Sequence, residues 1–82
     1  MSVINVKIIN PDQVLFDGEA SLVFAPGKIG TLGIMPDHSP MFAELIKGEI
    51  FIQGEKEAVI SLESGILKVK DNNLLILISG TE

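Results

Sequence analysis

Apolar and polar residues alternate along short runs of this sequence, and turn-forming residues separate one run from the next. In the first run, residues 4–8, isoleucine and valine fall on one side and asparagine and lysine on the other. In a second run, Ala20, Leu22 and Phe24 are expected on one face, and the run ends at Pro26-Gly27. Successive side chains of a strand point to opposite faces, so each run predicts a strand with one buried face.

The second half of the chain repeats this rhythm. Residues 49–53, 57–62 and 66–70 alternate in the same way, while Gly54-Glu55 and residues 71–73 are expected to form turns. Valine and isoleucine together number 18 against four alanines, a composition that favours pleated structure over helix. Several short strands at this spacing predict an all-β domain, either an antiparallel sandwich or a barrel.

Two segments depart from the alternation because they are apolar on both faces. These are Leu74–Ile78 and, nearly so, Met41–Ala43. The outer face of a two-layer sandwich is ordinarily polar, so a doubly apolar strand needs cover on both sides. One interpretation is a corner strand over which both sheets fold. The other is a face that awaits a partner or a missing part of the protein.

The size and composition of the chain limit its architecture. The chain has 82 residues and no cysteine, so disulfides and thiolate sites are excluded. A chain this short supports one small hydrophobic core, and we expect a single β-sandwich domain over residues 1–82. The low share of charged residues, 21%, indicates a folded chain and not a disordered one.

The charge balance excludes several partners. The net charge is −5, and all six basic residues are lysine, whereas nucleic-acid binding needs a basic excess and leans on arginine. The longest apolar run is far shorter than the roughly 20 residues that cross a bilayer, so direct membrane insertion is not expected. With no signal segment in view, we expect a cytoplasmic protein.

Two patterns have the residue types of a chemical site, and neither predicts catalysis. Glycines recur every three residues from Gly27 to Gly33, but no helix pattern follows to make a phosphate loop. Asp37, His38 and Ser39 have the residue types of a hydrolytic triad, yet neighbours in an extended chain point apart. No metal, cofactor or catalytic site is therefore expected. His38 itself is expected either to bond local backbone or to serve as a contact residue on a stiff, proline-bracketed loop.

The stretch GTLGIMPDHSP, from Gly30 to Pro40, resembles the signature of the epsilon chain of the rotary, proton-driven ATP synthase. Every fixed position of that family's G-x-L-G-I-x-P-x-H-x-P pattern is filled here. The flanking segments 15–18, 47–48 and 64–69 are similar as well, so the resemblance runs from about Val3 to Ile78.

The resemblance implies a flattened antiparallel β-sandwich of about ten short strands and a non-catalytic, coupling role in the central stalk. It implies two partners, the gamma shaft and the ring of membrane subunits, no nucleotide, and a place at the cytoplasmic face of the bacterial inner membrane. The implied gamma-side residues are Asn10, His38, Ala43 and Glu63. The implied ring-side residues are Gly27, Lys28, Ile29, Gly30 and Thr31.

Two departures limit what the resemblance implies. Many family members have an acidic residue where Thr31 stands, so a ring contact through that charge is in doubt. The family's C-terminal pair of helices has no counterpart in this sequence, and neither inhibition nor ATP binding by those helices is carried over. An alternative function is a free-standing β-sandwich adaptor that binds a peptide at a sheet edge, which would not co-purify with an ATP synthase.

Overall fold

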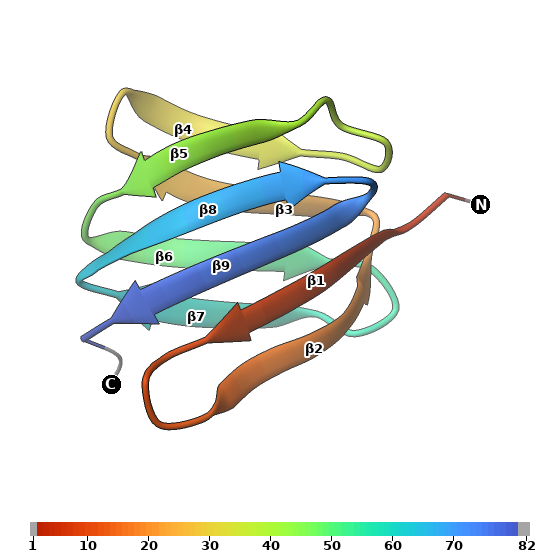
Figure 1. Ribbon diagram of the computed structural model, residues 1–82. Helices are drawn as coiled ribbons and strands as arrows, with labels where there is room; N and C mark the ends of the chain where they lie inside the picture. The colour runs from red at the N-terminus through yellow and green to blue at the C-terminus, as the bar shows by residue number, and fades with distance from the viewer. Residues whose placement is uncertain (1, 81–82) are drawn as a thin grey trace.

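The computed structural model describes residues 2–80, which form nine strands and no helix (Figure 1). The all-β prediction is confirmed, with one strand fewer than the ten that the resemblance implies. The strands are β1 (Ile4–Ile9), β2 (Val14–Ala20), β3 (Leu22–Gly27), β4 (Gly30–Ile34), β5 (Met41–Leu45), β6 (Gly48–Gln53), β7 (Ala58–Leu62), β8 (Ser64–Lys70) and β9 (Asn73–Ser79).

All nine strands belong to one sheet that curls back on itself. Its order is β2-β1-β9-β8-β5-β3-β6-β7, with β4 paired to the other side of β3. The curl produces two layers, which we call the front layer (β5, β8, β9 and β1) and the back layer (β4, β3, β6 and β7; Figure 1). The ninth strand, β2, pairs with β1 at the end of the sheet order. The layers join where β3 meets β5 through the single residue pair Gly27 and Leu45. The molecule measures 33 × 25 × 17 Å, and its short axis fits two layers stacked about 10 Å apart.

One strand pair departs from the antiparallel prediction. β1 runs parallel to β9, in a register that joins Asn5 to Asn73 and Ile9 to Leu77. Every other pair among the described strands is antiparallel. A hairpin connection forces antiparallel pairing on neighbours in sequence. Because β1 and β9 come from opposite ends of the chain, no short turn imposes that direction on them.

The core lies between the layers and follows the alternation of the sequence. Sixteen apolar side chains are buried there, and no polar or charged residue among those described is buried. Ile50 and Ile52 in β6 and Leu67 and Val69 in β8 are nearly inaccessible, as their positions predict. Each fully buried aliphatic side chain of this kind contributes about 1.5–3 kcal/mol relative to exposure, so the core is the main source of stability.

The prediction that Ala20, Leu22 and Phe24 of the second run share one face is wrong. The chain bends at Ser21, whose N–H and hydroxyl both donate to the carbonyl of Gln53, at 2.8 and 3.1 Å. The bend shifts the alternation by one residue, so that Val23 is buried while Leu22 and Phe24 are only partly covered. Ala20 therefore does not share its face with Leu22 and Phe24.

The loops gather at two opposite ends of the sandwich (Figure 1). What we call the Lys28 end holds the connections at residues 10–13, 28–29, 46–47 and 63. The His38 end holds the connections at residues 35–40, 54–57 and 71–72. β8 and β9, of seven residues each, run from one end to the other, a separation of roughly 20 Å at 3.3 Å per residue.

Candidate functional site

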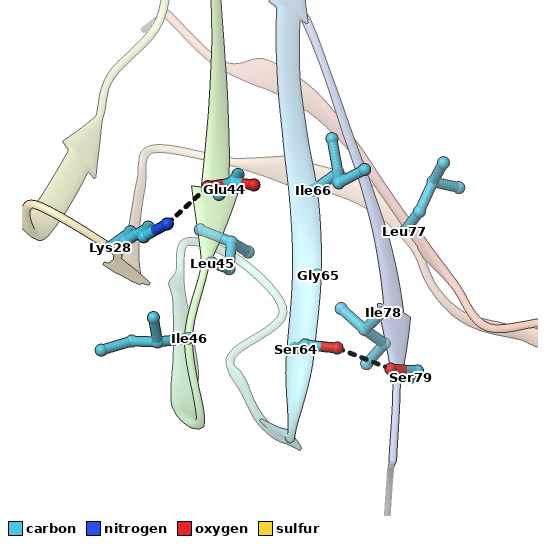
Figure 2. A pocket seen from close by; sticks show the side chains of 10 residues that line it. All are labelled: Lys28, Glu44, Leu45, Ile46, Ser64, Gly65, Ile66, Leu77, Ile78 and Ser79. Atoms are coloured by element: carbon cyan, nitrogen blue, oxygen red, sulfur yellow. Dashed lines mark hydrogen bonds and ion pairs between the residues drawn. The ribbon is translucent and has the colours of Figure 1, made fainter.

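The outer face of the front layer carries a groove of about 550 Å³ near the Lys28 end (Figure 2). Its apolar lining includes Ile66 of β8 and Leu77 of β9, which face each other across the strand pair, and Ile46 beyond the end of β5. The side chains of Ile66 and Leu77 are 40% and 43% exposed. Both residues occupy the outward positions of strands whose inward positions fill the core, so their exposure follows directly from the strand period.

Two polar pairs border the groove. The Lys28 Nζ lies 3.3 Å from the Glu44 Oε2, and the hydroxyls of Ser64 and Ser79 lie 2.8 Å apart (Figure 2). An ion pair this exposed contributes little to stability, because water solvates both charges when they separate. Its two side chains are consequently free to exchange partners with an incoming surface.

The apolar surface extends beyond the groove. Phe42, on the outward side of β5, is 68% exposed, and its cross-strand neighbours in the same row are Lys68 of β8 and then Leu75 of β9. A row of cross-strand neighbours links Glu44 to Ile66, Ile66 to Leu77, and Leu77 to Ile9 of β1. Of the two interpretations of the doubly apolar segments, the covered corner strand is wrong: within residues 2–80 the inward side chains meet the core and the outward ones reach solvent.

The four implied gamma-side residues do not form one cluster. Asn10 and Glu63 lie at the Lys28 end, where Glu63 pairs with Lys47 at 3.9 Å, and His38 lies at the opposite end. Ala43 occupies the middle of β5 opposite the buried Leu67, on the side that faces the core. All four nevertheless belong to the front layer or to loops that enter or leave it. They are spread over that layer, from one end of it to the other.

The five implied ring-side residues do come together, in the hairpin that joins β3 to β4. Ile29 at its tip is fully exposed, with a relative accessibility of 102%. The hairpin has room only for glycine at its base: a Cβ on Gly27 would lie 2.5 Å from the carbonyl oxygen of Gly30. The Lys28 N–H donates to the Glu44 carbonyl at 3.0 Å, which ties the hairpin to β5.

His38 makes only local hydrogen bonds in the structure. Its ring Nδ1 lies 2.8 Å from the carbonyl oxygen of Ser39, and its backbone N–H donates to the Met35 carbonyl at 3.2 Å. A carbonyl only accepts, so Nδ1 is the donor in this bond. The hydroxyl and carboxylate of a triad take no part in these bonds. Of the two roles expected for His38, the bond to local backbone is confirmed.

The acidic residues are dispersed. Within residues 2–80 there is no group of three or more His, Cys, Asp or Glu side chains placed to hold a metal ion. That part of the chain likewise has no helix of the length and hydropathy needed to cross a membrane.

The sequence motifs do not single out Phe42, Ile66 and Leu77, the exposed apolar residues of the front layer. The signal was present for Phe42 and Leu77, which lie in the segments that are apolar on both faces, whereas Ile66 is the apolar residue that begins the alternating run 66–70. Sequence alone does not tell which member of each run points outward. That assignment requires the register of β5, β8 and β9.

Comparison with known proteins shows which protein family this chain matches. Residues 3–82 match the family model described as ATP synthase, Delta/Epsilon chain, beta-sandwich domain. The ATP synthase epsilon chain of Leptospira borgpetersenii is 43% identical over 75 residues, which are 90% of this chain and 59% of that one. The chloroplastic epsilon chain of Porphyra purpurea is 35% identical over 96% of this chain and 60% of its own length. The chain thus spans about three fifths of these relatives.

Solved structures share the fold at low sequence identity. A chain of the Euglena gracilis mitochondrial ATP synthase superposes with a TM-score of 0.90 at 15% identity, covering 100% of this chain and 54% of that one. A chain of the Tetrahymena thermophila mitochondrial ATP synthase central stalk and c-ring superposes with a TM-score of 0.82 at 17% identity, covering 95% and 64%. At these identities the likeness concerns the fold alone.

Proposed function

This chain belongs to the family of the β-sandwich domain of ATP synthase delta and epsilon chains, and from that premise we propose that it is a non-catalytic component of the central stalk. In this role it binds the gamma shaft and the ring of membrane subunits and helps couple proton flow to ATP synthesis. It is held peripherally at the membrane through those partners. The single observation that carries the proposal is the groove on the outer face of the front layer, about 550 Å³, which is larger than the hollow of about 370 Å³ beside the exposed Phe51 and Val59 of the back layer.

The shaft is proposed to lie against the front layer. Ile66, Leu77 and Phe42 supply the apolar centre of the contact, and the loop residues Asn10, His38 and Glu63 lie around its margin. Apolar centres with polar rims are the usual anatomy of protein interfaces. A standard interface covers about 800 Å² on each partner, which is roughly a sixth of the 5075 Å² accessible surface of this chain.

The ring is proposed to meet the Lys28 end. The hairpin of residues 27–31 projects there and presents Ile29 to solvent. With Thr31 in place of an acidic residue, this contact relies on shape and on Ile29 instead of on a fixed negative charge. The two proposed partners thus use one face and one end of the same sandwich.

Binding to purified gamma subunit tests the proposal with a matched pair of variants. Ile66→Lys places a charge in the centre of the front face, whereas Val59→Lys places the same charge at an exposed position of the back layer, 58% accessible. We expect Ile66→Lys to weaken binding by about 2 kcal/mol, roughly 30-fold, as loss of a central contact does. Val59→Lys should change the affinity less than about twofold.

Calorimetric titration measures both affinities, and thermal unfolding verifies that both variants fold. Equal weakening by the two variants, or no binding by the unaltered chain, contradicts the proposal. The adaptor alternative is favoured by the free outer edge of β4, which pairs only with β3. It predicts instead that a peptide binds along β4 and that this chain is absent from purified ATP synthase.

A further inference from the structure

The loop that carries His38 has an unusual backbone conformation. The His38 N–H donates to the Met35 carbonyl, and Pro36 and Asp37 occupy the two central positions of the turn. Asp37 has a φ of 64°, which with proline before it is the pattern of a type II turn. That position ordinarily holds glycine, since a residue with a Cβ meets steric opposition there. Aspartate adopts this φ more readily than most residues with a side chain, and support from outside the loop helps to hold it there.

The side chain of Asn72 supplies that support from a distant part of the sequence. Its Oδ1 accepts the N–H of Asp37 at 2.8 Å, across 35 residues. Its Nδ2 donates to the carbonyl oxygen of Val3 at 2.8 Å. Both halves of one amide are thus engaged, and they connect the His38 loop, the β8–β9 turn and the segment that enters β1.

The backbone of Asn72 explains why asparagine suits this position. Asp71 and Asn72 form the two-residue turn between β8 and β9, with φ of 53° and 61°. Two positive φ values are the pattern of a type I′ turn, and asparagine adopts them more readily than most residues with a side chain. Glycine would satisfy the backbone equally well, but it has no amide to offer to Asp37 and Val3.

We propose that Asn72 is a positioning residue that fixes the His38 loop in one conformation before any partner arrives. A fixed loop loses less conformational entropy on binding. Only this consequence for affinity rests on the proposed function. The fixing of the loop itself is a property of the isolated chain.

Amide hydrogen exchange, followed by NMR, tests the proposal in the isolated chain. Asn72→Gly keeps the turn and removes the amide. The Asp37 N–H should then exchange about two- to tenfold faster, the effect of losing one hydrogen bond. Asn73→Thr is the matched control. It removes the adjacent amide, which bonds to Asn5 and Asp71 and not to the loop, and should leave the Asp37 rate unchanged.

Asn72→Asp is a second test variant for the same exchange measurement, because aspartate keeps an acceptor for the Asp37 N–H and loses the donor to the Val3 carbonyl. Slow exchange at Asp37 in this variant supports the proposal. Exchange as fast as in Asn72→Gly overturns it, and so does an unchanged Asp37 rate in Asn72→Gly. Equal acceleration at the remote turn of residues 10–13 overturns it too, since Asn72 would then act on global stability.

Titration of Asn72→Gly with purified gamma subunit separates this inference from the proposed function. If both hold, its affinity falls by about two- to tenfold, in line with the exchange rates. If the unaltered chain does not bind gamma, the proposed function fails, and the exchange measurements still decide the role of Asn72.

Discussion

The side-chain contacts at the two ends of the sandwich differ in their chemistry. At the His38 end, short neutral side chains bond to backbone groups: Asn72 to Asp37 and Val3, and Asn73 to the carbonyl of Asp71 at 2.9 Å. At the Lys28 end, long side chains form exposed ion pairs, Lys28 with Glu44 and Lys47 with Glu63. Shorter polar contacts accompany them: Asn10 accepts the N–H groups of Asp12 and Gln13, and the hydroxyls of Ser64 and Ser79 pair.

This difference indicates which loops of the domain are rigid and which side chains can change conformation. A short amide has few rotamers to lose, and its bond to a backbone group fixes the loop that carries that group. An exposed ion pair holds two flexible side chains in a high dielectric and is worth about 0–1 kcal/mol. The His38 end is thus preorganised. At the Lys28 end, backbone bonds tie the hairpin to β5, and it is the exposed side chains, Ile29 among them, that are able to adjust to a partner.

The largest effect that separates the two ends is expected from Asp37→Val. Valine is branched at Cβ and tolerates a positive φ poorly, so the variant should lose about 1–2 kcal/mol of unfolding free energy. Asp37→Gly removes the same carboxylate but introduces glycine, which accepts this φ, so the unfolding free energy should change little. Urea denaturation gives both values. Equal losses in the two variants would show that the carboxylate, and not the backbone conformation, matters.

A smaller effect is expected from Lys28→Met at the other end. Methionine keeps the length of the side chain but removes the charge that faces Glu44, and the unfolding free energy should fall by less than about 0.5 kcal/mol. Because salt screens exposed charges, the difference between this variant and the unaltered chain should vanish near 1 M NaCl. A loss above about 1 kcal/mol that persists at high salt would mean that the Lys28 end is as firmly fixed as the His38 end.

Local sequence patterns predicted much of the fold, because strand alternation is itself a local property. The inward positions of β6, β7 and β8 and a turn after Lys70 were readable in this way, although the turn is Asp71-Asn72 and Asn73 already begins β9. The bend at Ser21 was not, since it depends on the carbonyl of Gln53 in another strand. The parallel pairing of β1 with β9 likewise joins the two extremes of the chain.

The candidate surfaces were predictable to a lesser degree. The apolar character of residues 74–78 indicated an unusual strand but left open whether its second face was covered. The signature resemblance singled out His38 and the hairpin at residues 27–31, yet not the link between Asn72 and the His38 loop. A single asparagine in a hairpin turn has many possible roles, and only the three-dimensional register shows what its amide reaches.

The central claim, that the front layer is the shaft-binding face, is tested most directly by NMR mapping. Labelled chain is titrated with unlabelled gamma subunit, and the perturbed amides are placed on the structure. The account predicts that the largest perturbations fall on Phe42, Ile66 and Leu77, with Phe51 and Val59 of the back layer unaffected. Perturbations centred on the back layer, or none at saturating gamma subunit, would contradict it.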